Sequence, residues 1–320
     1  MNFLHRGLGA ALIALAAIAP AQAAQPALAT VANLPEGARP AGVPLDYVVT
    51  PNGYFHPSCV VRLAAGETVL EDGSVQRSDG SRRAVAACLH AAYETRAAAR
   101  NRQPDAAAFD GWLAYSLTDP DVTPPASGMV ADWTVPEAPA NASGQVLYYF
   151  PGLEAVPNTR SILQPVLGWN GYNNAAWTMA NWNCCIRGTV YTDTPFNVNV
   201  GDAIHGQMRG TGCTETAPCK AWQIVSTDTT NGRTTTMRTR AYGQVFNWYF
   251  GGVMEVYGIR SCDQLPASGS VAFTGVRVVD FNGQPVRPPW QTQIDNTAPA
   301  CSYGVDTGPR TTTITFDPAS

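Results

Sequence analysis

The sequence has 320 residues, of which 14% are charged, and its net charge is −4 at pH 7. An acidic chain with a single lysine, Lys220, and no basic tail offers no surface suited to a phosphate backbone, so we exclude nucleic acid as a partner. The low charged fraction is typical of a large β fold whose strands alternate apolar residues with Thr, Ser and Asn.

The first 23 residues read as a secretory signal peptide. Arg6 supplies the positive start, and residues 8–19 are almost wholly apolar. Ala21 and Ala23 give the small-x-small pattern after which signal peptidases cut. The apolar stretch is too short to span a bilayer, and no later segment is apolar enough to do so. We therefore predict a chain that does not associate with a membrane and is secreted, to the extracellular space or the periplasm.

Eight cysteines follow the signal peptide, and an even number in an exported chain favours disulfides. There is no CxxC pair and there are few histidines, so we predict no metal site and no cofactor. Cys213 and Cys219 are close enough to close one loop, and Cys59 with Cys88 would close an N-terminal subdomain. The sequence leaves open how the other four cysteines pair: Cys184, Cys185, Cys262 and Cys301.

Residues 24–105 differ in composition from the rest, and we interpret them as an N-terminal pro-region or accessory subdomain. After a lead rich in Pro and Ala, residues 45–69 resemble short β-strands. Residues 82–102 are rich in Ala and have apolar residues at spacing four, which predicts a helix. This region is therefore expected to be a small α+β unit.

The predicted helix is also basic, because it carries several arginines against the single acid Glu94. It is either a solvated helix face or a basic pro-segment that lies on an acidic surface of the remaining chain. Attraction between opposite charges fades as carboxylates take up protons. In the second case the protein would be a zymogen that opens in acid.

From about residue 109 the chain is a series of short apolar or β-branched segments bounded by Pro, Gly or Asn, with no helical pattern between them. This pattern predicts that residues 106–320 form one all-β domain, an antiparallel two-sheet sandwich or jelly roll. The predicted strands are 128–135, 145–150, 161–169, 175–182, 188–191, 203–209, 222–226, 233–239, 244–249, 253–259, 270–279 and 310–316.

The familiar motifs of nucleophilic and nucleotide chemistry are absent: there is no GxSxG, no HExxH and no P-loop. Two predicted strands instead place a polar residue in an apolar row. Glu255 shares a strand face with Val253 and Tyr257, and Gln164 interrupts the apolar face of residues 161–169. Either residue could be unremarkable, the glutamate on the solvated face of an edge strand and the glutamine as a hydrogen-bonded core residue.

Together, however, the two segments resemble the eqolisins, a family of acid-acting glutamic peptidases. Ile162-Leu163-Gln164, followed by Trp169, resembles the family's Ile-Leu-Gln strand, and Glu255 lies in an apolar strand farther along, as the family's glutamate does. Shorter matches in the same order extend the resemblance over roughly residues 108–280: Gly111-Trp112-Leu113-Ala114, Val130-Ala131-Asp132-Trp133-Thr134-Val135-Pro136 and Gly201-Asp202-Ala203-Ile204.

The resemblance implies a concanavalin-like β-sandwich in which Gln164 and Glu255 form the catalytic pair of an acid endopeptidase. Glu255 would take the proton of an attacking water, and the Gln164 amide would stabilise the oxyanion. We expect a monomer that acts on a polypeptide. Four aromatic residues near the two motifs are predicted to contact that substrate: Phe150, Tyr149, Trp169 and Tyr257.

Two positions depart from the family pattern. Phe150 (or Tyr149) stands where the family has a tryptophan before the glutamine motif, and Gly168 stands where the family has an acidic residue. Two other functions stay open. One is a carbohydrate-binding or glycoside-hydrolysing jelly roll, which as an enzyme would need Glu154 or Glu137 beside Glu255. The other is a neprosin-like peptidase that uses two glutamates.

Overall fold

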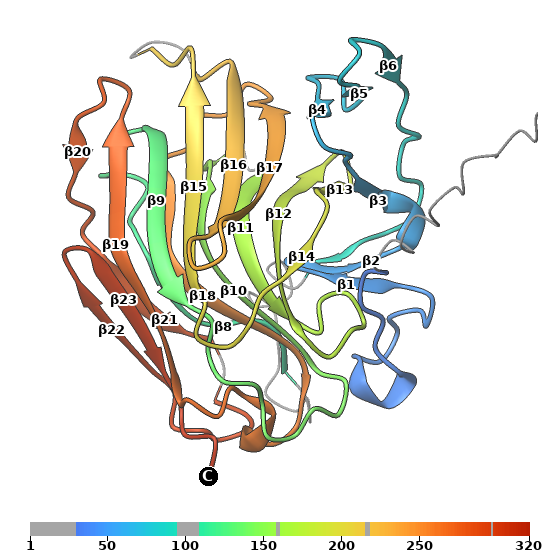
Figure 1. The fold of residues 1–320 in the computed structure, drawn as a ribbon, viewed down its shortest axis with the longest axis vertical. Helices are drawn as coiled ribbons and strands as arrows, with labels where there is room; N and C mark the ends of the chain where they lie inside the picture. Colours follow the sequence, from blue (N-terminus) through green and yellow to red (C-terminus); the bar gives the residue numbers. More distant parts are fainter. Residues whose placement is uncertain (1–29, 95–108, 158–160, 215–217, 296) are drawn as a thin grey trace, which may run out of the picture.

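The computed structural model describes residues 30–94, 109–157, 161–214, 218–295 and 297–320. These residues form a sandwich of two large β-sheets, with a small third sheet against one of them (Figure 1). The predicted signal peptide lies outside the described residues. Within the part of the chain that is described, no helix is long and apolar enough to cross a membrane.

We call the nine-stranded sheet sheet I and the eleven-stranded sheet sheet II. Sheet I has the order β21-β8-β18-β10-β11-β12-β13-β3, with β14 beside β12. Its strands are β3 (Val60–Arg62), β8 (Phe109–Leu117), β10 (Val146–Glu154), β11 (Ile162–Trp169), β12 (Trp177–Ile186), β13 (Thr189–Thr192), β14 (Phe196–Asn197), β18 (Trp248–Ile259) and β21 (Gln291–Ile294).

Sheet II has the order β22-β23-β19-β9-β15-β16-β17-β4-β5-β6, with β20 beside β19. Its strands are β4 (Thr68–Val69), β5 (Val75–Gln76), β6 (Arg82–Arg83), β9 (Ala126–Thr134), β15 (Ala203–Thr211), β16 (Ala221–Asp228), β17 (Arg233–Arg240), β19 (Ser270–Asp280), β20 (Pro285–Val286), β22 (Gly304–Gly308) and β23 (Thr311–Thr315). The small sheet holds β1 (Val48–Thr50), β2 (Gly53–Phe55) and β7 (Tyr93–Glu94), and the short 3-10 turns are η1 (Glu36–Ala38), η2 (Pro57–Cys59) and η3 (Cys262–Gln264).

The predicted all-β sandwich is confirmed, but the sheets are mixed rather than purely antiparallel. Strand β3 pairs in parallel with β13 at the edge of sheet I, and β4 pairs in parallel with β17 in sheet II. The N-terminal region thus supplies strands to both large sheets. A second difference is that residues 244–247 of the strand predicted at 244–249 are not in a strand, whereas Trp248 and Tyr249 continue into residues 253–259 as the single strand β18. Gly251 and Gly252 are accommodated there by a shift of register instead of ending the ladder.

The prediction of an α+β N-terminal region is wrong for the residues that the structure describes. Arg82 and Arg83 lie in a strand that pairs with β5, and their side chains form ion pairs with Asp72 and Glu67. These partners belong to the N-terminal region itself, not to the acidic remainder of the chain. Strand pairing and local ion pairs outweigh the helix propensity of the alanines. The rest of the predicted helix, from residue 95 onward, lies outside the described residues.

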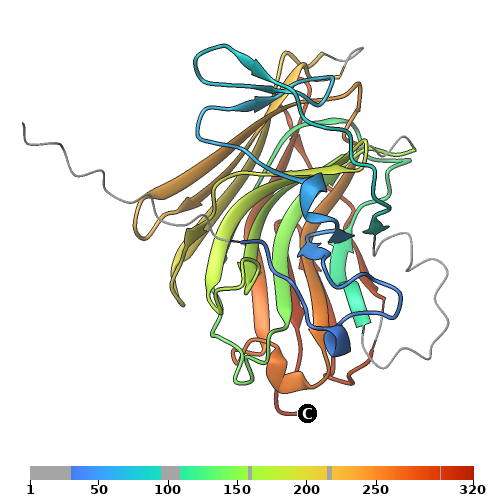
Figure 2. The same ribbon diagram turned by 90° about the vertical axis from the view of Figure 1, so that its right-hand side faces the viewer.

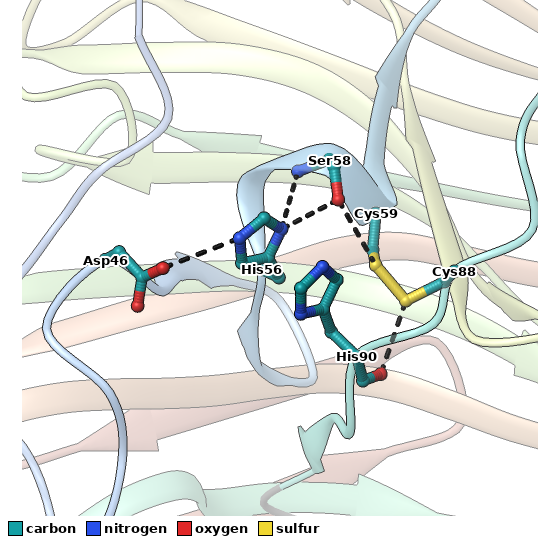
Figure 3. The surroundings of a disulfide bond; sticks show 6 residues. All are labelled: Asp46, His56, Ser58, Cys59, Cys88 and His90. Carbon is teal, nitrogen blue, oxygen red and sulfur yellow. Dashed lines mark hydrogen bonds and ion pairs between the residues drawn. A yellow bond between two sulfur atoms is a disulfide. The ribbon is translucent and has the colours of Figure 1, made fainter.

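The four disulfides are Cys59–Cys88, Cys184–Cys185, Cys213–Cys219 and Cys262–Cys301. The two pairs expected from sequence spacing are confirmed. Figure 3 shows that Cys59–Cys88 joins the end of η2 to the segment that carries His90, whose ring stacks on that of His56 at 3.6 Å. This crosslink gives the last part of the N-terminal region a fixed attachment.

The two faces of sheet I are both buried, whereas sheet II alternates buried and partly exposed residues, as in β16. One face of sheet I packs against sheet II and forms the inter-sheet core. The other face packs against residues 31–55, which Figure 2 shows in blue in front of the sheet. We call this second set of side chains the N-terminal cluster; it includes Leu34, Tyr47, Tyr54, Phe55, Ile162, Val166, Val253 and Tyr257.

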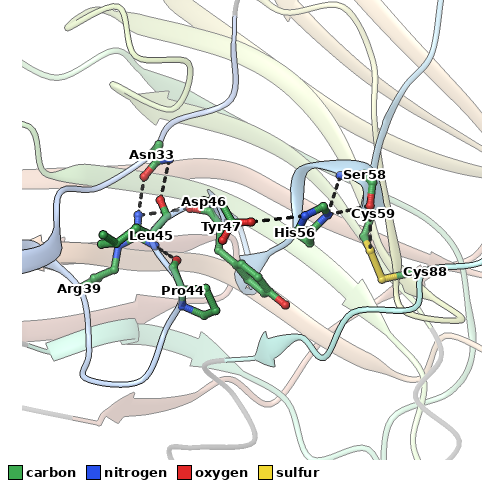
Figure 4. A network of polar contacts seen from close by, with 10 residues as sticks. All are labelled: Asn33, Arg39, Pro44, Leu45, Asp46, Tyr47, His56, Ser58, Cys59 and Cys88. Carbon is green, nitrogen blue, oxygen red and sulfur yellow. Dashed lines mark hydrogen bonds and ion pairs between the residues drawn. A yellow bond between two sulfur atoms is a disulfide. The ribbon is translucent and has the colours of Figure 1, made fainter.

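Arg39 holds the lead of the N-terminal region in shape. Its buried guanidinium donates hydrogen bonds to the backbone carbonyls of Leu34, Pro44 and Tyr47 and to the side chain of Asn33. Figure 4 shows Arg39 among Asn33, Pro44 and Tyr47. A buried charge needs such partners, since leaving it without them would cost several kcal/mol. The region is therefore a built cover over sheet I, not a loosely attached tail.

Asp193 joins the two large sheets through a buried carboxyl group. It accepts hydrogen bonds from the Asn181 backbone (2.8 Å) and side chain (2.6 Å) on β12 and from the Thr235 hydroxyl (2.8 Å) on β17. Burial raises the pKa of Asp193 from 3.8 to about 7, although these hydrogen bonds act in the opposite direction. The protonated form therefore stabilises the fold fully below pH 3.8, and the contribution is lost as the pH rises to about 7.

We expect Asp193→Asn to remove this dependence, because an amide does not titrate. Relative to the wild type, the free energy of unfolding of the variant should rise by up to about 1.4 kcal/mol per pH unit between about pH 4 and pH 7. Urea denaturation across this range measures it. The exposed Asp306→Asn serves as the control for the loss of one carboxylate. Parallel pH curves for the wild type and Asp193→Asn would contradict the prediction.

Candidate active site

Gln164 and Glu255 lie on the same buried face of sheet I, on strands separated only by β10. Along β11, Leu163 and Leu167 point into the inter-sheet core, so the alternation of side chains turns Gln164 toward the N-terminal cluster. Met254 and Val256 flank Glu255 in the same way on β18. Both polar side chains have no exposed surface. The strand alternation that the sequence indicated for these two residues is therefore present.

Asn52 of the N-terminal region connects the two side chains. Its backbone N–H donates to Glu255 Oε1 at 2.9 Å, and its Nδ2 donates to Gln164 Oε1 at 3.0 Å. Both contacts come from one residue, so Gln164 and Glu255 lie within the reach of a single asparagine. The pair thus faces one small volume, which the N-terminal region fills.

The local sequence explains how Asn52 reaches this place. Pro51 and Asn52 are the two central residues of the turn between β1 and β2, in which Thr50 pairs with Gly53. Proline favours the first central position of such a turn, and Asn52, at φ 130°, adopts the positive φ that asparagine and glycine tolerate best. The Pro-Asn-Gly sequence therefore makes a tight hairpin tip, and the tip points at the pair.

The amide nitrogen of Gln164 is buried and, among the described residues, Nε2 has no hydrogen-bond partner. A buried donor in this state costs about 1–3 kcal/mol relative to a paired one. Such groups are rare in folded proteins, and their explanations include a bound water or ion and a catalytic role. The donor is thus available to an oxygen atom bound between Gln164 and Glu255.

Two tyrosines surround Glu255. The Tyr257 hydroxyl donates to Glu255 Oε1 at 2.5 Å and fixes the carboxylate from its own strand. Tyr148 lies directly opposite Glu255 on β10, and burial, together with the charges of Tyr172 and Glu255, raises its pKa well above the usual value. Tyr148 therefore stays a neutral hydroxyl beside the carboxylate.

The Tyr148 ring also explains why a glycine stands before Trp169. A Cβ atom placed on Gly168 would lie 3.0 Å from the ring of Tyr148, and a Cβ on Gly171 would lie equally close. A larger residue at position 168 would displace the ring. The departure from the eqolisin pattern at this position thus has a local packing cause.

The four predicted substrate-contacting aromatics divide between the two faces of sheet I. Phe150 and Tyr257 belong to the N-terminal cluster, on the side of Gln164 and Glu255. Tyr149 and Trp169 belong to the inter-sheet core, because the strand alternation turns them away from the pair. Phe150 packs edge-on against Trp112 at 5.6 Å, so the position that differs from the family pattern still holds an aromatic ring on this face.

Glu154, the second carboxylate considered beside Glu255, lies elsewhere. It pairs with Trp248, whereas Tyr148 pairs with Glu255. The six residues between Tyr148 and Glu154 correspond to about 20 Å along an extended strand. Glu137 is exposed and follows β9, outside the strands of sheet I. The arrangement therefore does not favour a two-glutamate site with either residue.

Two residues at this site, Asn52 and Asp110, were not predicted from the sequence. The Pro-Asn-Gly tip between two apolar segments was a readable signal of a hairpin, but it does not show where the hairpin docks. Asp110 begins β8 beside β18, and it accepts the backbone N–H of Gly258 (2.7 Å) and the hydroxyl of Tyr54 (2.5 Å). Only the folded structure brings these residues together.

No family model and no curated protein matches the sequence. The structure is similar to that of Scytalido-glutamic peptidase solved with a peptide-based transition state analog, with 15% identity, a TM-score of 0.47, and coverage of 65% of this chain and 98% of that chain. SCP-B, a member of the eqolisin family solved with the tripeptide Ala-Ile-His, is similar with 15% identity and a TM-score of 0.45, and the match covers 65% of this chain and 98% of that chain. Aspergilloglutamic peptidase from Aspergillus niger is similar with 16% identity and a TM-score of 0.35, and the match covers 53% of this chain and 98% of that chain. The resemblance to eqolisins that the motifs indicated is thus accompanied by structural matches to glutamic peptidases over about two thirds of the chain.

Proposed function

We propose that this chain is a secreted acid endopeptidase in which Glu255 activates water and Gln164 stabilises the oxyanion. The observation that carries the proposal is that Asn52 hydrogen-bonds to both side chains on one buried face of sheet I. A peptide group of a substrate has the same kinds of atoms as the asparagine amide. The space that Asn52 fills is therefore suited to a peptide bond.

The chemistry follows from the groups in place. Glu255, held by the Tyr257 hydroxyl, takes a proton from a water molecule as that water attacks the peptide carbonyl carbon. The Nε2–H of Gln164 donates to the oxygen that gains negative charge. The C–N bond then breaks as protonated Glu255 gives its proton to the leaving nitrogen, which restores the carboxylate. A neutral amide donor does not titrate, so it acts equally well in acid.

Location and conditions agree with this proposal. All eight cysteines are paired in disulfides, which persist mainly in oxidising compartments outside the cytoplasm. The buried carboxyl of Asp193 makes the fold more stable as the pH falls toward 4. An exported enzyme that works in acid needs both properties.

The test is hydrolysis of an acid-denatured protein by the full chain at about pH 3–5 and at about pH 7, with products identified by mass spectrometry. We expect new peptides in acid and few at neutral pH. The proposal would be contradicted if neither the full chain nor chain that has lost its N-terminal region gave products at any pH. An optimum at neutral pH would contradict the acid optimum that we expect.

The same geometry leads us to propose that residues 24–105 are an inhibitory pro-region. Asn52 occupies the space between the catalytic pair, and the N-terminal cluster covers that face of sheet I. Peptide substrates cannot reach Gln164 and Glu255 while this cover is in place. The proposed enzyme is therefore made as a zymogen. Apolar packing and hydrogen bonds hold the N-terminal region over the site, where the sequence had suggested a basic helix.

Glu67 gives this cover a dependence on acid. It accepts hydrogen bonds from the Ala64 backbone (3.0 Å) and from Arg83 (2.9 Å), immediately before β4 joins sheet II. Burial alone would raise the pKa of Glu67, but the hydrogen bonds from Arg83 and Ala64 outweigh it and lower the pKa below 4.5. The stability that Glu67 contributes is present above pH 4.5 and is lost as the pH falls through the lowered value.

We expect Glu67→Gln to loosen the N-terminal region already near neutral pH, because the charge-assisted hydrogen bonds are lost. An added protease should digest residues 30–94 about five- to tenfold faster than in the wild type at about pH 6, and the difference should shrink in acid. The exposed neighbour Glu71→Gln is the matched control. Equal digestion rates for Glu67→Gln and the wild type at pH 6 would show that Glu67 does not hold the cover.

A further inference from the structure

We propose that Asp110 and Tyr257 form a subsite for a tyrosine side chain of the substrate, two residues from the one held at Gln164 and Glu255. This inference rests on the proposed function. It comes from the way in which the chain's own Tyr54 lies on sheet I, beside the catalytic pair.

Tyr54 is bound through both parts of its side chain. Its hydroxyl donates to Asp110 Oδ2 at 2.5 Å. Its ring meets the ring of Tyr257 edge to face, with 5.4 Å between the centroids and 90° between the planes. Only 1% of Tyr54 is exposed. A phenol at this place thus satisfies a polar group and an aromatic surface at the same time.

The partners of Tyr54 belong to the sandwich, not to the N-terminal region. Asp110 is on β8 and Tyr257 on the neighbouring strand β18. The backbone N–H of Gly258 donates to Asp110 Oδ1 at 2.7 Å and fixes the carboxylate, with Oδ2 directed at the Tyr54 hydroxyl. These two residues stay behind when the pro-region leaves, so the subsite is a property of the released enzyme.

The spacing to the catalytic pair follows from the hairpin. Asn52 lies at the pair, and Tyr54 follows it in the extended strand β2. The hydrogen bonds of Asn52 to Gln164 and Glu255, and of Tyr54 to Asp110, place both residues against the same face of sheet I. If a substrate follows the same path and places one residue at Gln164 and Glu255, the residue two positions later reaches Asp110 and Tyr257.

Tyrosine fits this subsite better than its nearest relatives. Phenylalanine would keep the ring contact but would leave the buried Asp110 carboxylate without the hydroxyl, a loss that specific sites use to reject such analogues. Lysine would supply a donor but not the edge-to-face ring contact with Tyr257. In the zymogen, Arg39 lies over the Tyr54 ring, 5.6 Å from its centroid, and covers the subsite from outside.

The experiment uses the full chain after incubation at about pH 4 and a peptide mixture made from denatured proteins, with cut sites read by mass spectrometry. We expect tyrosine to be enriched over phenylalanine at one fixed position relative to the cut. Two synthetic peptides that differ only by Tyr or Phe at that position should then differ about tenfold in kcat/KM.

The variant Asp110→Asn tests the residue itself. Its amide oxygen can still accept the Gly258 N–H, but it turns an NH₂ group toward the phenol oxygen, and this neutral hydrogen bond is weaker than one to a carboxylate, so the Tyr/Phe ratio should fall. Equal kcat/KM values for the two peptides in the wild type would overturn the inference alone, whether or not the variant folds. An unchanged ratio in a folded Asp110→Asn would also overturn it. No hydrolysis of any peptide would overturn the proposed function, and the inference with it.

Discussion

Replacing Glu255 by glutamine is expected to lower kcat for peptide hydrolysis at acid pH by at least about 10³-fold. The amide keeps the size of the carboxylate, and its oxygen can still accept the hydrogen bonds of the Asn52 N–H and the Tyr257 hydroxyl. It cannot take a proton from water. The variant should therefore fold, retain the N-terminal cover and fail only in the chemical step.

Gln164→Met is the companion change on the other side of the pair. Methionine fills a similar volume in the apolar surroundings of Ile162 and Val166 but has no N–H donor. Loss of one oxyanion donor lowers kcat by about 10²–10³-fold. The exposed Glu137→Gln is a matched control that repeats the charge change away from the site and should keep wild-type activity.

Initial rates on one peptide, measured for folded protein at the pH optimum, decide the matter. Hydrolysis that survives Glu255→Gln would contradict the assignment of the base. Hydrolysis that survives Gln164→Met would contradict the assignment of the oxyanion donor and would leave Glu255 to act with a different partner. Circular dichroism spectra of each variant separate a lost reaction from a lost fold.

The sandwich was predictable because short apolar or β-branched segments recur between Pro, Gly and Asn, and because strands of sheet II such as β16 show the period of two that half-buried strands require. The placement of Gln164 and Glu255 was predictable because each interrupts a row of apolar residues on one face of its strand. The resemblance to the eqolisins in the order and spacing of the motifs then suggested that these two strands, far apart in the chain, contribute to one site. Periodicity gave the face of each residue, and the resemblance suggested which two strands to combine.

The N-terminal region was harder to predict because its structure depends on the sandwich. Strands β3 and β4 are short, and each joins its large sheet by pairing with a strand that follows more than a hundred residues later. The alanines before the sandwich favour a helix locally, but pairing and the Cys59–Cys88 bond override that preference in the described residues. The prediction that Tyr149 and Trp169 contact the substrate relied on their closeness to the motifs in sequence. In the structure both side chains face the inter-sheet core.

The second large effect concerns Asn52, and the informative change is Asn52→Asp. The variant has the same shape and tolerates the same turn, but at neutral pH it places a carboxylate where the Asn52 side-chain amide donates to Gln164 Oε1, in the same small buried space as the carboxylate of Glu255. Two like charges without a cation between them cost about 3–5 kcal/mol in a buried site, so the hairpin 48–55 should leave sheet I far more often. Hydrogen exchange of the hairpin amides should rise by at least about 100-fold at pH 7.

The same repulsion disappears when one of the two carboxyls is protonated, so the increase should shrink steadily as the pH falls. This direction is opposite to that expected for a merely strained turn, in which exchange would rise by a constant factor at every pH. The exposed Asn174→Asp is the matched control and should leave the hairpin unchanged. Protection of residues 48–55 that is the same in Asn52→Asp and in the wild type at pH 7 would mean that the tip is not held by the pair. The cover would then depend on the apolar contacts of the N-terminal cluster alone.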